Sequence, residues 1–176
     1  MAPSGDDAVR LTVAAAMVFQ VSAHARAGLR TAAQCFEAQA RLLLADGEST
    51  HRARVAAAGA RVESAAADEL AAAVTHRDNE ILEADRRRQS LIAAIARHRL
   101  DEDTRARHHR AAIDRFERSA QQMLIEAGRG DLCAYRPTVD SAGGVTVDEL
   151  VAALELAVHD LRRRVDAYLR DPRAAR

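Results

Sequence analysis

Residues 50–99 read THRARVAAAGARVESAAADELAAAVTHRDNEILEADRRRQSLIAAIARHR, and this run decides the fold. It contains no proline and a single glycine, Gly59, and most of its residues are good helix formers such as alanine, arginine, glutamate and leucine. At about 1.5 Å per residue, one continuous helix over this run would be roughly 75 Å long. Such a helix cannot bury its own apolar stripe, so we expect partner helices to pack along its length.

The composition fits one helical module with a weak core. The chain has 176 residues, 48% of them apolar, but alanine supplies much of that fraction, and aromatic residues make up only 3%. Alanine-rich helices bury little area per residue, so we expect self-association or another protein to supply further burial. All 26 basic residues are arginine, as GC-rich coding would give, and the net charge of zero argues against a generic binder of nucleic acid or membrane surfaces.

Breaks in the pattern divide the first 127 residues into three expected helices. Gly47 can adopt the positive φ that follows a helix end, so the pattern predicts a first stop at residues 45–49. The acidic run at residues 100–103 predicts a second break, although a helix that continues through Asp101 stays open. Gly128 is expected to end the third helix and to begin a loop over residues 128–145.

A fourth helix is expected over residues 146–170. Thr146 and Glu149 stand at the spacing of a capping box, in which each side chain satisfies the backbone N–H of the other residue. Pro172 closes this helix, and residues 171–176 form a basic tail. We therefore predict an all-α fold, an antiparallel assembly of three to four long helices. Residues 1–127 form a coiled-coil-like hairpin or bundle, followed by the loop and the C-terminal helix.

Two sets of side chains are candidate binding residues. Apolar positions at spacings of three and four predict seams that meet another protein or a second copy. These are Ile113, Phe116, Leu150, Leu154, Leu161 and Val165. Arginine triplets predict a basic patch for an acidic protein or for nucleic-acid phosphates. These are Arg86, Arg87, Arg88, Arg162, Arg163 and Arg164.

No constellation in the sequence specifies catalysis. His98 and Glu102 alone have the i, i+4 spacing of a helical metal site, which is too few ligands, so we predict no metal, no cofactor and no small-molecule substrate. A solvated turn explains the surrounding polar cluster of residues 98–110 better. Cys35 falls next to the apolar stripe and is expected in the core, whereas Cys133, in the loop, is the better candidate for a reactive thiol.

The sequence predicts no membrane span, because no apolar run approaches 18 residues. A signal peptide is a weaker alternative reading of the N-terminal region. Residues 11–19 are apolar, and Ala23-His24-Ala25 has the small-x-small form of a cleavage site. Asp6 and Asp7 make the head of this region acidic, and the same apolar residues fit the buried stripe of a helix.

Four short motifs occur in an order that is similar to a known protein family. They are the Gly47-Glu48-Ser49-Thr50 turn, Arg97-His98-Arg99-Leu100-Asp101, Gln121-Gln122-Met123-Leu124-Ile125-Glu126-Ala127, and Gly128-Arg129-Gly130-Asp131-Leu132. Over about residues 10–135 the chain resembles the herpesvirus minor tegument protein family, the small chaperone-like protein encoded next to the tegument protein kinase.

The resemblance implies a virion component without catalytic activity, located in the viral tegument and in the host cytoplasm and nucleus. It implies tegument or capsid proteins as partners, chaperone-like help in their nuclear targeting, and a part in envelopment. Two other hypotheses stay open. One is a cytoplasmic bacterial coiled-coil accessory of a secretion or flagellar export apparatus, and the other is a helical nucleic-acid-binding protein that uses its arginine-rich faces.

Overall fold

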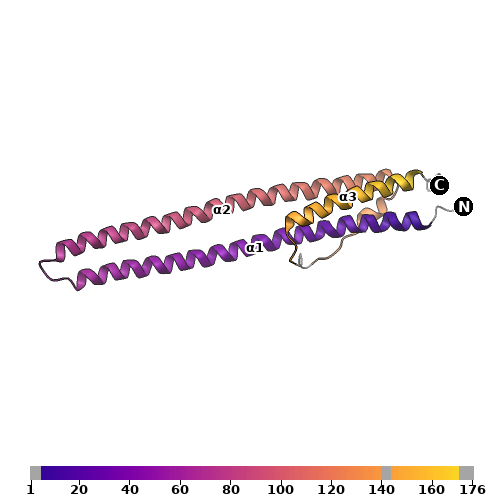
Figure 1. Ribbon diagram of the computed structural model, residues 1–176. Coiled ribbons are helices and arrows are strands. Elements are labelled where there is room, and N and C mark those ends of the chain that lie inside the picture. Colours follow the sequence, from indigo (N-terminus) through magenta and orange to yellow (C-terminus); the bar gives the residue numbers. More distant parts are fainter. Residues whose placement is uncertain (1–4, 140–143, 171–176) are drawn as a thin grey trace. The chain divides into compact units, whose positions relative to one another are not determined.

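The computed structural model describes residues 5–139 and 144–170, and among these residues every regular element is a helix (Figure 1). Two long helices come first, α1 (Gly5–Glu63) and α2 (Leu70–Glu126). A short 3-10 helix, η1 (Gly130–Ala134), and α3 (Val147–Arg170) follow. The predicted all-α fold, with two long antiparallel helices and a C-terminal helix, is confirmed.

The two internal breaks expected from the sequence are absent. α1 continues through Gly47, so the predicted stop there is wrong, and α2 continues through Asp101. At Gly47 the missing side chain lets α2 approach, because a Cβ at this position would overlap Cδ2 of Leu91. Asp101 and Asp103 are exposed on the surface of α2, so the acidic run is solvated without ending the helix.

The chain reverses direction at residues 64–69, inside the run that was expected to form one rod. The backbone N–H of Ala65 donates to the carbonyl of Val62 at 3.3 Å, and that of Glu69 donates to the carbonyl of Ala66 at 3.0 Å. Ser64 Oγ also donates to the carbonyl of Arg61 at 3.2 Å. Packing of α1 against α2 therefore overrides the high helix propensity of the alanines between them.

The chain divides into two compact units, each crossed by both long helices. The three-helix unit comprises Met1–Ala33 and Thr104–Arg176, and the hairpin unit comprises Gln34–Asp103. The three-helix unit holds the largest cluster of buried side chains, contributed by the first half of α1, the second half of α2 and α3. Leu11, Ile113, Leu124, Leu154 and Leu161 are all fully buried there.

The expected ends of the helices in the three-helix unit are confirmed. Gly128 has φ +69°, and the N–H groups of Gly128 and Arg129 return to the carbonyls of Ile125 and Leu124 at 2.9 and 2.8 Å, which is a Schellman motif. Thr146 N–H donates to Glu149 Oε2 at 2.8 Å, and Glu149 N–H donates to Thr146 Oγ1 at 3.3 Å. Thr146 Oγ1 also donates to Glu149 Oε2 at 2.7 Å. This bond and the one from the Thr146 N–H lower the pKa of the Glu149 carboxyl below its ordinary value.

Parts of the predicted loop and tail lie outside the described residues. The loop expected over residues 128–145 contains η1, and its residues 140–143 are not described. The predicted basic tail of residues 171–176, with Pro172, is likewise outside the described part of the chain.

Ion pairs fix the register of the hairpin unit. Arg99 Nη2 lies 2.9 Å from Glu37 Oε2, and Arg88 Nε lies 2.7 Å from Glu48 Oε2. His51 Nε2 lies 2.7 Å from a carboxylate oxygen of Asp85. The midpoint of each pair is residue 68, within the turn, so the two helices pair without a shift in register along this stretch.

The two glycines of α1 in the hairpin unit allow a matched test of this packing. Nothing lies within 4 Å of a Cβ built at Gly59, so Gly59→Ala should stabilise the protein by about 1 kcal/mol through helix propensity alone. Gly47→Ala gains the same propensity, but the end of the Leu91 side chain must move, so it should be less stable than Gly59→Ala by about 0.5–1 kcal/mol. Urea unfolding followed by circular dichroism would measure both, and equal shifts would contradict the close approach at Gly47.

Candidate protein-interaction surface

The predicted seam residues lie in the interior of the three-helix unit. Ile113 of α2 and Leu154 and Leu161 of α3 have no exposed surface, and Leu150 and Val165 are also buried. Phe116 is partly buried against the same cluster. These side chains pack against one another in the chain's own core, so the apolar spacing is accounted for without a binding partner.

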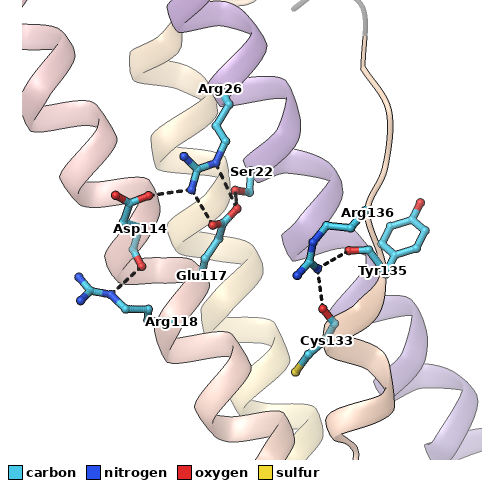
Figure 2. Close-up of polar contacts among 8 residues, drawn as sticks. All are labelled: Ser22, Arg26, Asp114, Glu117, Arg118, Cys133, Tyr135 and Arg136. Carbon is cyan, nitrogen blue, oxygen red and sulfur yellow. Dashed lines mark hydrogen bonds and ion pairs between the residues drawn. The ribbon is translucent and has the colours of Figure 1, made fainter.

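A polar cluster crosses from α1 to α2 in the same unit (Figure 2). Arg26 Nη2 lies 2.7 Å from Asp114 Oδ1 and 2.6 Å from Glu117 Oε2. The hydroxyl of Ser22, which has no exposed surface, donates to Glu117 Oε1. The hydrogen bond that Arg26 donates to Glu117 is the main cause that raises the pKa of Arg26 above its ordinary value.

Sequence reasoning missed this cluster, although a signal for it exists. Ser22 and Arg26 are four residues apart, and Asp114 and Glu117 are three apart, so each pair presents one polar face on its helix. The contacts join α1 to α2, so the cluster helps to fix the register of these two helices.

The segment around η1 holds the second cysteine. Figure 2 shows Arg136 beside the carbonyl oxygens of Cys133 and Tyr135, to which its Nη1 donates at 2.5 and 2.9 Å. Burial raises the pKa of the Cys133 thiol above its ordinary value, which disfavours the reactive thiolate expected from the sequence. Cys35 is exposed, so its predicted place in the core is wrong.

The two arginine triplets belong to different units and are largely paired with acidic neighbours. In the hairpin unit Arg87 pairs with Glu83 and Arg88 with Glu48. In α3, Arg163 and Arg164 both pair with Asp160. Arg86 and Arg162 are exposed. Neutralisation by carboxylates weakens each triplet as a phosphate-binding patch.

The polar cluster of residues 98–110 lies on continuous α2, and not in a turn between helices as expected. Arg99 pairs with Glu37 of the hairpin unit, and His109 Nε2 lies 2.7 Å from Asp148 Oδ1 at the start of α3. Over residues 5–139 and 144–170, no group of three histidine, cysteine, aspartate or glutamate side chains could hold a metal ion.

The hairpin unit exposes large apolar side chains where its two helices run side by side. Leu42 is 71% exposed, Leu43 52% and Leu100 62%, and Leu44 and Ile92 are exposed as well. We call these five residues the apolar belt. The register of the ion pairs sets Leu44 opposite Ile92 and Leu100 opposite Phe36, so the belt extends along the hairpin from the level of Ile92 to that of Leu100. Exposed apolar surface concentrated in this way is typical of a protein-binding site.

The core beneath the belt is thin. The buried hydrophobic residues of the hairpin unit are Ala40, Ala58, Ala84 and Ile95. A groove runs between the helices at this level, lined by Leu44, Gly47, Leu91 and Ile92, with Glu48 and Arg88 beside it. The two helices of the hairpin unit are therefore joined by little apolar contact, and that further helices supply additional burial stays a prediction.

By length and composition alone, α1 could cross a membrane, whereas the sequence predicted no membrane span. Near the N-terminus its apolar side chains are core residues of the three-helix unit, among them Leu11, Val18 and Phe19. The core helix of a soluble protein and a signal sequence meet the same two criteria, so this property is weak evidence for a membrane span.

The apolar belt is therefore the strongest candidate for a functional surface in the described part of the chain. It combines exposure, clustering on two helices and a groove, whereas the seam residues and the buried polar cluster serve the interior of the three-helix unit. Comparison with known proteins gives no independent guide, because no protein-family model, curated protein or solved structure matches this chain.

Proposed function

We propose that this chain is a non-enzymatic protein that acts by binding another protein through the apolar belt of its hairpin unit. The belt itself carries the proposal, because Leu42, Leu43 and Leu100 are each more than half exposed over a core made almost entirely of alanine. Covering such side chains with a partner stabilises a complex by about 25 cal/mol per Å² of apolar surface.

The resemblance to the herpesvirus minor tegument family supplies the setting that we propose for this binding. In that setting the chain is a virion component in the tegument, host cytoplasm and nucleus. Its partners are other tegument or capsid proteins, which it helps to reach the nucleus and to become enveloped. A bacterial export accessory is the alternative, since such proteins are also helical hairpins, and genome neighbourhood separates the two.

A matched pair of leucines tests the belt. Leu42 of the belt and Leu156 of α3 are both 71% exposed, so aspartate at either position should leave the fold intact. Leu42→Asp should reduce capture of tegument or capsid proteins by about tenfold or more, because a charge then enters an apolar contact. Leu156→Asp should leave capture unchanged. Affinity purification from producing cells, with quantitative mass spectrometry, measures both.

Two results would count against the proposal. Equal capture of partner proteins by Leu42→Asp and Leu156→Asp would show that the belt does not bind them. Absence of the protein from purified virus particles would contradict a tegument location, but it would not contradict binding of another kind of partner through the belt.

A further inference from the structure

We propose that the hairpin unit pairs with a second copy of itself, face to face and antiparallel, through the side of the belt that carries Leu44 and Ile92. This goes beyond the proposed function, which rests on Leu42, Leu43 and Leu100. Of these three, Leu42 and Leu43 are the ones next to Leu44 on α1. Those two leucines precede Leu44 in α1 and point away from the groove that Leu44 lines, so they stay accessible to a different protein.

The pairing face is defined first on α1. It consists of Glu37, Arg41, Leu44, Glu48 and Arg52, whose spacings of three and four place them on one side of a helix. We call this the self face. Leu44 stands at its centre, with one acidic and one basic residue on each side.

When the self faces of two copies meet antiparallel, the acidic residues of one copy come opposite the arginines of the other. With a twofold axis between Leu44 and Ala45, Arg41 comes opposite Glu48 of the second copy. Glu37 comes opposite Arg52 of the second copy. Glu37 and Glu48 are also the partners of Arg99 and Arg88 in their own copy, so each carboxylate is shared between an arginine of its own hairpin and one of the second copy. Arg41 and Arg52 supply the added positive charge, and this order favours one antiparallel arrangement.

The second helix fits the same axis. Because the ion pairs of the hairpin set Leu44 level with Ile92, the axis also passes close to Ile92. By the same register the axis falls between Leu91 and Ile92, so Ile92 comes opposite Leu91 of the second copy. The groove beside Gly47 and Leu91 lies at the same level and receives the apolar side chains of the second copy.

The size of the contact predicts a reversible dimer. From Glu37 to Arg52 the face runs about 24 Å along two helices, each about 10 Å wide, or roughly 500 Å² on each copy. Weak and transient protein pairs have interfaces of this size, whereas stable ones bury about 800 Å² on each partner. We therefore expect monomer and dimer in exchange, with the dimer dominant at about 100 µM.

Sedimentation equilibrium of the full chain gives the first test. A mass approaching twice the chain's 19.1 kDa at about 100 µM supports the proposal, and a monomer at that concentration overturns it. Arg41→Glu should weaken the dimer about tenfold, because glutamate then faces Glu48 of the second copy, and Arg41→Glu with Glu48→Arg should restore it. A dimer that is insensitive to Arg41→Glu would also overturn the proposal.

Cysteine cross-linking tests the axis itself in a full chain with Cys35 and Cys133 replaced by serine. Ala45→Cys lies at the axis and should form a disulfide-linked dimer on mild oxidation. Ala56→Cys, three turns further along the same side of α1, would be roughly 35 Å from its counterpart and should not. Cross-linking at Ala56 and not at Ala45 would refute the antiparallel arrangement.

The two proposals can fail separately. Leu42→Asp should dimerise normally while it loses tegument or capsid proteins, so loss of both properties in that variant would show that the two surfaces are one. Circular dichroism of each variant excludes unfolding as the cause of lost association.

Discussion

Leu154→Asp is expected to unfold the three-helix unit. Leu154 has no exposed surface and packs in the core that α1, α2 and α3 share. Removing a buried leucine side chain destabilises proteins by about 2–5 kcal/mol, and an unpaired carboxylate in the same space adds a desolvation penalty. A total of about 5 kcal/mol or more is comparable with the whole stability of a small domain. Leu161→Asp, equally buried, should behave alike.

The same helix provides the control. Leu156 lies two residues from Leu154 but is 71% exposed, so Leu156→Asp should change the free energy of unfolding by no more than about 0.5 kcal/mol. Tyr135 and Tyr168 are the only tyrosines, the chain has no tryptophan, and both tyrosines belong to the three-helix unit. Near-ultraviolet circular dichroism therefore reports on this unit specifically. A native tyrosine signal in Leu154→Asp would show that α3 is not a core element.

The helix ends and the core stripe of α3 could be predicted because the information is local. Thr146 and Glu149 are three residues apart, and Gly128 needs only its own freedom to adopt positive φ, so neither depends on distant residues. Leu150, Leu154 and Leu161 recur at helical spacing and are buried together. The seam was predicted to meet a partner because spacing identifies a buried face but does not identify what buries it.

The positions at which the two long helices continue and reverse could not be predicted from local sequence. Gly47 was expected to end a helix, but it lies inside α1, where a Cβ would meet Cδ2 of Leu91, 44 residues away in the chain. The true reversal at residues 64–69 contains three alanines and no glycine or proline, so propensity predicts helix there. The ion pairs of Glu37 with Arg99 and Glu48 with Arg88 share the midpoint 68, and such long-range charge matching was the signal that could have located the turn.

Glu117→Ala is expected to destabilise the three-helix unit by about 2 kcal/mol. The change removes the acceptor of the Ser22 hydroxyl, which is fully buried, and a buried donor without a partner costs about 1–3 kcal/mol. It also removes one of the two carboxylates on Arg26, which keeps Asp114. Because Arg26 is partly exposed, water compensates for much of the lost ion pair between Arg26 and Glu117. The unsatisfied hydroxyl of Ser22 therefore accounts for most of the expected change in the free energy of unfolding.

A double-mutant cycle isolates the hydrogen bond from Ser22 to Glu117. Ser22→Ala removes the donor together with the need for an acceptor, so Glu117→Ala in that background should destabilise by about 1 kcal/mol less than in the native chain. Glu117→Gln keeps an oxygen that can accept from Ser22 and should fall between the native chain and Glu117→Ala. Urea unfolding followed by the tyrosine signal gives the four free energies. Strict additivity of Ser22→Ala and Glu117→Ala would mean that Ser22 finds another acceptor, such as a carbonyl one turn earlier in α1, and that Glu117 acts through Arg26 alone.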